Sequence, residues 1–305
     1  MNLRQVIVAG AMLLAFPAFA QPQTGLLERS YPMAEAGGMA MPYSVYVPKG
    51  YDRSRTWPLV MVLHGAGGDH RTVFTGSNLA EVAEQRGVIV VAPLGYNAFG
   101  GWGVIYPTIV TANTAKRGSK AILGLSRTAG MTAPPTNPAR SVDEPPAGAD
   151  EAHVEVPPSD LADPEASRLS EIDAMNVLGL VRKDFNIDPA RIYLMGNSMG
   201  GVGTAYLAVK YPKLWAAVSP SGGVVAAWSY PAEHLADNDV AALFVHGEKD
   251  EHGHYRFNRA LVDSARAKGG DIGFLLVQGG SHSRAWITAL PQTFDFLLAH
   301  RRTPD

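Results

Sequence analysis

The chain of 305 residues contains no cysteine. This absence excludes disulfide bonds, cysteine nucleophiles and thiolate metal sites together. Disulfides are also not required for stability, because a chain of this length with 46% apolar residues can bury a sizeable core.

The sequence also lacks an excess of basic charge. It has 26 lysine and arginine residues against 28 aspartate and glutamate residues, a formal net charge of −2. Nucleic-acid-binding proteins carry a clear excess of positive charge, so this class is set aside.

Long hydrophobic runs are missing too, apart from the beginning of the chain. There Arg4 precedes a short apolar run over residues 6–16, and Ala18-Phe19-Ala20 forms an A-x-A cleavage pattern before Gln21. The run is too short to span a bilayer. We therefore expect a signal peptide over residues 1–20, a mature chain over 21–305 in the periplasm or the medium, and no membrane contact after cleavage.

The rest of the chain alternates between strand and helix patterns. Residues 43–47 alternate apolar and polar side chains and predict an antiparallel edge strand. Continuous apolar runs at 58–63 and 88–92 predict strands buried on both faces, with a helix at 78–86 between them. Further strands are expected at 191–195, 216–219, 242–246 and 273–277, with helices at 170–185, 199–211, 255–268 and 284–298. This order predicts a mostly parallel sheet with helices on both faces, in one domain.

One segment, residues 100–167, breaks the alternation. It is rich in Gly, Pro, Thr, Ala and acidic residues and has little hydrophobic periodicity. We expect an insertion that forms a lid or a partly disordered loop, with residues 131–164 a solvated linker. Three aromatic residues in or near such loops are candidates for a substrate wall or for ordinary packing: Trp102, Tyr106 and Trp228.

The nucleophile motif lies between a predicted buried strand and a predicted helix. Gly196-Asn-Ser-Met-Gly200 has the G-x-S-x-G pattern, and this strand–turn–helix setting is typical of a nucleophile elbow. The turn presents the hydroxyl of Ser198 above the sheet, and glycines flank it because a Cβ would collide with neighbouring backbone. The alternative is a serine-capped helix that follows a glycine turn.

A second glycine-rich loop, Leu63-His-Gly-Ala-Gly-Gly68, follows an earlier strand. In such a sheet this loop supplies one N–H of an oxyanion hole, and the residue after the nucleophile supplies the other. We assign these donors to Ala66 and Met199, with Gly65 or Gly67 as alternatives to Ala66. His64 is expected to orient the loop. A phosphate cradle is the other interpretation, but the Lys-Ser/Thr pair of a P-loop is missing.

The base and acid follow from chain order, which is Ser, Asp or Glu, then His. Among nine histidines, His282 lies just after the last predicted strand and before the last helix, so it is the expected base. Asp250 follows the preceding strand and is the expected acid, with Glu248 as its competitor; Asp263, in the next helix, would point away. Three further histidines lie around this loop: His246, His252 and His254. Their spacing does not match a zinc-protease pattern, so no metal is expected.

These motifs together resemble a known family. The run over residues 187–201, the loop at 63–68 and His246-Gly-Glu-Lys-Asp250 are similar to the polyhydroxybutyrate depolymerase and feruloyl/acetylxylan esterase group of α/β-hydrolases, and to esterases and peptidases related to the prolyl oligopeptidase catalytic domain. The resemblance covers about residues 40–95 and 170–298. It implies the α/β-hydrolase fold, a triad of Ser198, Asp250 and His282, and oxyanion donors Ala66 and Met199. The long insertion and the absence of disulfides depart from this group.

The resulting hypothesis is a secreted serine esterase that acts on small or polymeric esters, such as polyesters or plant-cell-wall esters. It would work through an acyl-enzyme and need no cofactor. A peptidase or an acyltransferase could use the same triad, and a catalytically inactive binding module would not react at Ser198.

Overall fold

The computed structural model describes residues 23–105, 163–223, 233–251 and 255–303. Three sequence expectations fall outside these ranges: the signal peptide, most of the insertion, and the four residues Tyr106, Trp228, His252 and His254. None of the helices in the described parts of the chain is both long and apolar enough to cross a membrane.

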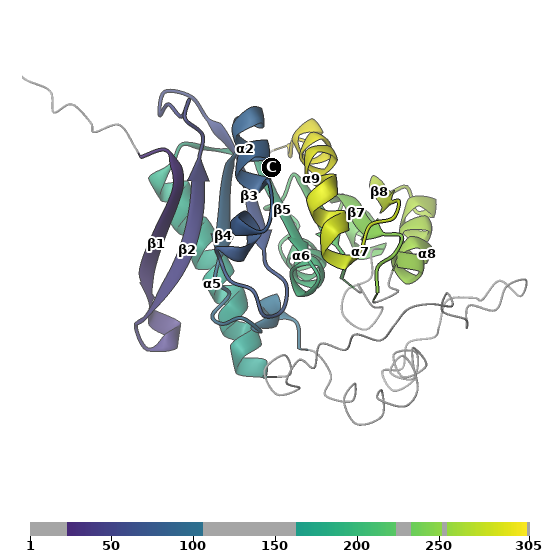
Figure 1. Cartoon of the computed structure of the whole chain (residues 1–305), viewed down its shortest axis with the longest axis horizontal. Coiled ribbons are helices and arrows are strands. Elements are labelled where there is room, and N and C mark those ends of the chain that lie inside the picture. Colours follow the sequence, from purple (N-terminus) through teal and green to yellow (C-terminus); the bar gives the residue numbers. More distant parts are fainter. Residues whose placement is uncertain (1–22, 106–162, 224–232, 252–254, 304–305) are drawn as a thin grey trace, which may run out of the picture.

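One eight-stranded sheet organises the molecule, in the order β1-β2-β4-β3-β5-β6-β7-β8 (Figure 1). β1 and β2 form an antiparallel hairpin, β2 also pairs antiparallel with β4, and all other neighbours are parallel. The strands are β1 (Gly25–Met33), β2 (Met39–Val47), β3 (Trp57–Leu63), β4 (Ile89–Pro93), β5 (Ile187–Asn197), β6 (Ala217–Ser221), β7 (Ala241–Gly247) and β8 (Ile272–Val277). The predicted mostly parallel sheet of the α/β-hydrolase fold is confirmed.

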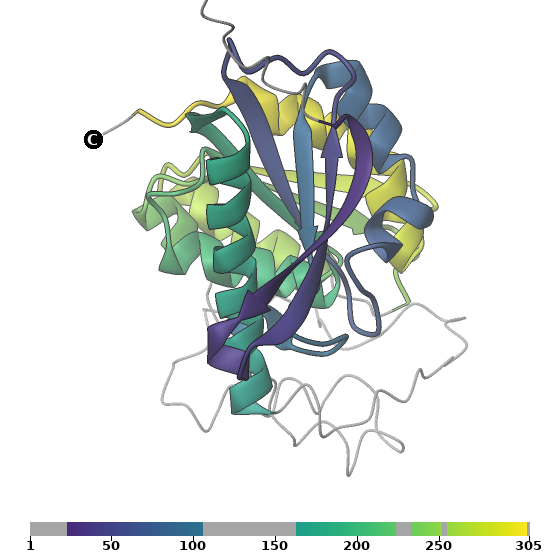
Figure 2. The same cartoon turned by 90° about the vertical axis from the view of Figure 1, so that its left-hand side faces the viewer.

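Helices cover both faces of the sheet, as Figure 2 shows in a view onto the β1 edge. One core joins the sheet to α5 (Pro164–Asp184), α6 (Met199–Lys210), α7 (Glu233–Asp237) and α8 (Tyr255–Ala267). The opposite core joins it to α1 (Thr72–Thr75), α2 (Leu79–Arg86) and α9 (His282–Ala299). Two short 3₁₀ turns complete the described elements: η1 (Ala34–Ala36) and η2 (Gly101–Gly103).

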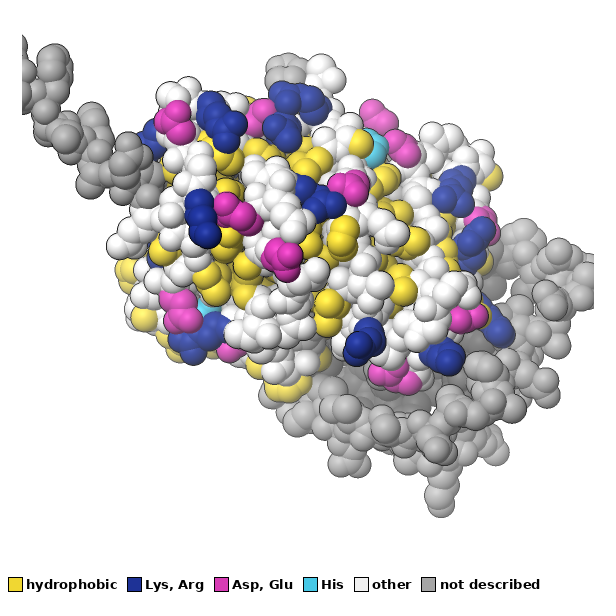
Figure 3. Space-filling model, turned by 45° about the horizontal axis from the view of Figure 1, so that its top comes forward, with side chains coloured by type: hydrophobic (Ala, Val, Ile, Leu, Met, Phe, Trp, Pro, Cys, Tyr) yellow, Lys and Arg dark blue, Asp and Glu magenta, His cyan; other side chains and the backbone are white. Residues whose placement is uncertain are grey.

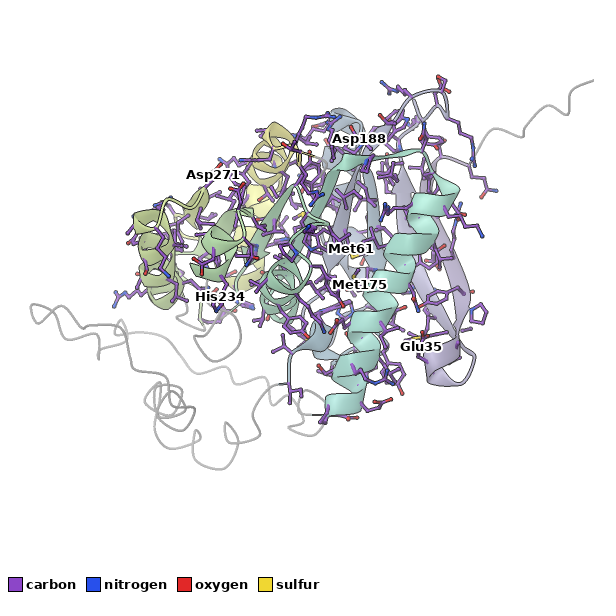
Figure 4. All side chains as sticks on the ribbon, turned by 180° about the vertical axis from the view of Figure 1, so that it is seen from behind. Glu35, Met61, Met175, Asp188, His234 and Asp271 are labelled. Atoms are coloured by element: carbon purple, nitrogen blue, oxygen red, sulfur yellow. The ribbon has the colours of Figure 1, made fainter. Side chains whose placement is uncertain are left out.

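The strand sequences match this double burial. Every residue of β3 and β4 is buried, as the continuous apolar runs predicted. Figure 4 labels Met61 of β3, which is buried in the core on the α5 side, and Met175 of α5, which is partly buried and packs against that core. Figure 3 shows charged side chains of both signs dispersed among hydrophobic ones, consistent with the small net charge.

Two expectations about element boundaries are wrong. The strand at 43–47 is not an edge strand, because residues 25–33 form β1 outside it. Met33 is the one buried residue of β1, so the apolar pattern of this strand is weak. The helix predicted at 170–185 begins six residues earlier, at Pro164. Its N-cap is Asp163, whose carboxylate accepts from the Glu165 N–H at 2.9 Å, and Pro164 occupies the first helical position.

Different residues lie at the two ends of the parallel strands. Asp188 and Asp271, at the beginnings of β5 and β8, lie at the end of the sheet opposite to His234 (Figure 4). Both carboxylates are paired with the C-terminal segment, Asp188 with Arg301 and Asp271 with His300. The carboxyl ends of the parallel strands lie at the end of the sheet opposite to Asp188 and Asp271. Ligand sites in sheets of this kind form at the carboxyl ends.

Candidate active site

Ser198 lies in a sharp turn between β5 and α6. Its backbone has φ 59° and ψ −121°, a conformation that residues other than glycine rarely adopt. The turn is held by the Ser198 N–H, which donates to the carbonyl of Ser221 at the end of β6 at 2.8 Å. The strand–turn–helix setting expected for a nucleophile elbow is therefore present.

The two glycines of the motif allow this turn to lie against β3. A Cβ on Gly200 would lie 2.1 Å from the Leu63 carbonyl oxygen and 2.7 Å from that of His64. A Cβ on Gly196 would lie 2.5 Å from the Gly200 oxygen. Real Cβ atoms do not approach backbone oxygens so closely, so only glycine lets the elbow and the end of β3 come together.

His282 and Asp250 come together from separate loops at the same end of the sheet. Asp250 follows β7, and His282 is the first residue of α9, after β8. The Nδ1 atom of His282 lies 3.0 Å and 3.1 Å from the two carboxylate oxygens of Asp250. The Asp250 side chain is fully buried and His282 is largely buried. This contact leaves the other ring nitrogen, Nε2, for a partner on the opposite side.

A further carboxylate, Glu251, supports the position of His282. The backbone N–H of His282 donates to Glu251 Oε2 at 3.1 Å. Burial by itself would raise the pKa of Glu251, but this hydrogen bond and the nearby imidazole outweigh it, so the pKa is lowered. The sequence analysis missed Glu251, because its role depends on how the loops after β7 and β8 pack.

The competing acids lie elsewhere. Glu248 is exposed and accepts from the N–H of Gly279 at 2.9 Å. Asp263 forms exposed ion pairs on α8 with Arg259 and Arg266. Neither is bonded to His282 in the described contacts, whereas Asp250 is.

The other described histidines also have separate environments. His70 is buried against the Ser44 hydroxyl, at 2.8 Å, and His234 is exposed on α7. His246 lies buried on β7, 2.8 Å from Asn258 Nδ2, and stacks on the Phe274 ring. Burial lowers the pKa of His246 to about 4, so its ring is neutral near pH 7. Among the described residues, no group of three or more His, Asp or Glu side chains is placed to hold a metal ion.

The loop over residues 64–68, called the oxyanion loop below, lies beside the elbow. A Cβ on Gly65 would be 3.2 Å from Ser198 Cβ, so the loop directly contacts the serine. The Gly67 N–H donates to the Ala98 carbonyl at 2.9 Å and the Gly68 N–H to the Gly65 carbonyl at 3.0 Å. These two amides are therefore engaged within the protein, which leaves Gly65 and Ala66 as the donor candidates of this loop.

His64 is buried and contacts backbone on both sides, as expected of a residue that orients the loop. Its Nδ1 lies 2.8 Å from the Gly65 carbonyl oxygen and its Nε2 lies 2.7 Å from that of Leu94. Burial lowers the pKa of His64 more than these two carbonyl contacts raise it. The neutral ring has one N–H, so only one of the two contacts is a donated hydrogen bond.

A pocket of about 320 Å³ opens where these segments meet, a small volume for a ligand site. Ser198 and His282 both line it, whereas Asp250 lies behind the histidine. Met199, the first residue of α6, is buried, and its N–H is one of those that a helix N-terminus leaves without an intrahelical partner. The lining residues are Gly65, Ala66, Gly67, Gly68, Asn197, Ser198, His282 and Ser283.

Trp102 does not line this pocket. Its side chain is fully buried, next to the His64 ring at a centroid distance of 4.9 Å. Trp102 therefore packs in the protein interior and does not form a wall of the substrate pocket.

Comparisons with known proteins identify a family for this chain. The sequence profile of the Esterase family matches residues 145–304, slightly more than half of the chain. Feruloyl esterase B of Neurospora crassa is 25% identical over 183 residues, which cover 59% of this chain. The chain spans 42% of the length of that curated relative.

Solved structures share the fold at low sequence identity. The S-formylglutathione hydrolase of Staphylococcus aureus has a TM-score of 0.58 and 17% identity, over 91% of this chain and 98% of its own. A ferulic acid esterase has a TM-score of 0.59 and 14% identity, over 90% and 98%. A thermostable esterase has a TM-score of 0.57 and 21% identity, over 91% and 63%. The expected resemblance is confirmed: this chain belongs to the Esterase family, a family of carboxylic ester hydrolases, and has the α/β-hydrolase fold.

Proposed function

We propose that this chain is a serine esterase in which Ser198 is the nucleophile, His282 the base and Asp250 the carboxylate that orients the base. The observation that carries the proposal is the convergence of three loops at one end of the sheet. Ser198 and His282 line one pocket, and the buried Asp250 lies 3.0 Å from His282 Nδ1. Membership of the Esterase family supports the hydrolysis of esters as the reaction.

In the acylation step, Ser198 Oγ attacks the ester carbonyl carbon and His282 Nε2 takes the hydroxyl proton. The tetrahedral intermediate collapses when the bond from carbon to the alcohol oxygen breaks. His282 returns its proton to that oxygen, and the alcohol leaves. Asp250 holds Nδ1–H and stabilises the imidazolium that forms in between.

In the deacylation step, water attacks the acyl-enzyme carbonyl and gives a proton to His282. The bond between the acyl carbon and Ser198 Oγ then breaks, and the serine oxygen takes the proton back. The products are a carboxylic acid and an alcohol, and the enzyme is regenerated. No redox partner or cofactor enters this balance.

The oxyanion of both intermediates would be held by the N–H groups of Ala66 and Met199. Ala66 lies in the pocket beside Ser198, while the N–H groups of Gly67 and Gly68 are engaged within the protein. Met199 begins α6, whose N-terminal end carries partial positive charge that favours an oxyanion.

For substrates we propose esters of plant cell walls or polyesters, with feruloyl esters as the first class to test. The support is the name of one sequence relative, Feruloyl esterase B, and of one structural neighbour, a ferulic acid esterase.

We further propose that residues 1–20 are removed as a signal peptide. Mass spectrometry of protein exported by a bacterial host would then find Gln21 at the N-terminus, and a retained Arg4 would contradict export by cleavage.

The experiment is a panel of activated esters from acetyl to long acyl chains, together with methyl ferulate, measured for wild type and Ser198→Ala. We expect turnover by the wild type and its loss in the variant, with the folded structure retained. Equal turnover by both proteins would overturn the assignment of Ser198. Ser198-dependent cleavage of peptides in preference to esters would favour a peptidase, and diversion of product by an added alcohol would favour an acyltransferase.

A further inference from the structure

The segment that follows β4, residues 94–103, meets the oxyanion loop at three polar contacts. His64 Nε2 lies 2.7 Å from the Leu94 carbonyl oxygen, and the Gly67 N–H donates to the Ala98 carbonyl at 2.9 Å. The third contact comes from a side chain: the indole N–H of Trp102 donates to the His64 carbonyl at 3.1 Å. The other two contacts use backbone carbonyls of the segment. Of the three, only the contact from the Trp102 indole can therefore be removed by a side-chain substitution in this segment.

Trp102 is held in an unusual conformation. Its φ is 60°, in the left-handed region that bulky residues rarely occupy, and its side chain is fully buried. Two neighbouring glycines leave room for it: a Cβ on Gly203 of α6 would lie 2.4 Å from Trp102, and one on Gly95 would lie 2.6 Å away. Strain of this kind persists only when the surrounding structure imposes it.

Helix α5 fixes the backbone of the same segment. The N–H of Trp102 donates to the Ser170 hydroxyl at 3.0 Å, and the N–H of Gly95 donates to the Asp173 carboxylate at 2.7 Å. Ser170 and Asp173 both lie in the middle of α5, where their side chains accept these two backbone hydrogen bonds.

The carbonyl that Trp102 holds lies at the junction of the oxyanion loop and the elbow. The same His64 oxygen would be 2.7 Å from a Cβ on Gly200, so it packs directly against the elbow. In a trans peptide the C=O and N–H bonds point in opposite directions, and every described peptide is trans. The His64 carbonyl and the Gly65 N–H belong to the same peptide group, so fixing the direction of the carbonyl also fixes the direction of this N–H. Gly65 directly precedes Ala66.

We propose that Trp102 is a positioning residue: by holding the His64 carbonyl, its indole N–H sets the oxyanion loop relative to Ser198. This inference rests on the esterase function proposed above. An oxyanion donor acts mainly in the transition state, so loss of its alignment lowers kcat and leaves KM nearly unchanged.

The test is Trp102→Phe, with Trp215→Phe as the matched control. Trp215 is equally buried, and its indole N–H also donates to a backbone carbonyl at 3.1 Å, that of Leu207 in α6, so it serves as a structural counterpart. We expect Trp102→Phe to lower kcat by about tenfold with KM changed less than about twofold. Trp215→Phe is expected to lower the melting temperature without this loss of kcat.

A second readout tests the oxyanion hole itself. A trifluoromethyl ketone forms a tetrahedral adduct with an active-site serine, and its oxygen mimics the oxyanion. Its inhibition constant should rise in Trp102→Phe by about the same factor as kcat falls, because both report on transition-state binding. An unchanged inhibition constant would overturn the inference.

A milder pair of variants decides the question if Trp102→Phe does not fold. Ser170→Ala removes the acceptor of the Trp102 N–H, whereas Ser167→Ala removes a buried α5 hydroxyl that has no hydrogen-bond partner among the described residues. We expect a fall in kcat for Ser170→Ala and none for Ser167→Ala. Equal kcat values for both, or equal losses for the two tryptophan variants, would overturn the inference. Absence of Ser198-dependent turnover in the wild type would instead overturn the proposed function.

Discussion

His282 and Asp250 are 32 positions apart in the chain, yet the Nδ1 atom of the histidine lies 3.0 Å from the carboxylate of the aspartate. Helix α8, strand β8 and the turn after it separate them in sequence, and the parallel pairing of β7 and β8 brings the carboxyl ends of these strands side by side. The contact is buried, so the carboxylate is shielded from water and holds the ring in one orientation.

The first prediction uses this contact. Asp250→Asn should lower kcat/KM by on the order of 10³ to 10⁴, because the amide no longer favours the tautomer and the charge that His282 needs. Glu248→Gln, at the competing carboxylate in the same loop, should leave kcat/KM within about twofold of wild type. Steady-state kinetics on one activated ester measure both. Comparable losses in the two variants would mean that the acid is wrongly assigned.

The second prediction concerns acid sensitivity at His246. Burial lowers the pKa of this ring from 6.5 to about 4, so between these values the unfolded chain binds the proton more readily than the folded protein. Stability is therefore complete above pH 6.5 and falls as the pH decreases toward 4, by up to about 3 kcal/mol. Urea unfolding of wild type across this range measures the loss.

The variant His246→Gln should remove this part of the pH dependence, because its amide does not titrate. His234→Gln, at an exposed position on α7, should retain the wild-type dependence. If the free energy of unfolding of His246→Gln depends on pH as that of the wild type does, the loss of stability at low pH does not come from His246.

The third prediction contrasts two glycines. Gly200→Ala places a Cβ against two backbone oxygens at the elbow, so it should destabilise the fold by about 3 kcal/mol and abolish turnover. Gly179→Ala, in the exposed part of α5, meets nothing within 4 Å and should stabilise the protein by about 0.5 to 1 kcal/mol. Thermal unfolding and ester turnover of the two variants check this. Similar stability changes in both would show that close packing at Gly200 is not the cause.

Sequence reasoning located the residues whose signals are local. The buried strands at 58–63 and 88–92 are continuous apolar runs, and the setting of Ser198 follows from a strand, a glycine turn and a helix in direct succession. His282 and Asp250 were found by chain order, which is a property of the fold and not of the flanking residues. The structure brings these residues to one end of the sheet.

Residues defined by packing between distant segments were missed. Asn258 bonds to both His246 and the Gly223 carbonyl, and Glu251 accepts from His282, but neither has a distinctive spacing. The start of α5 was misplaced because Asp163-Pro164, a typical helix start, lies at the end of a segment with little apolar periodicity. Strand β1 was missed because only one of its nine residues, Met33, is buried.

The most direct test of the central claim is covalent labelling with a fluorophosphonate, followed by mass spectrometry of the digested protein. The account predicts one adduct, on the peptide that contains Ser198, and its loss in both Ser198→Ala and His282→Ala. An adduct on Ser283, which lines the same pocket, or no adduct on the folded wild-type protein, would contradict it.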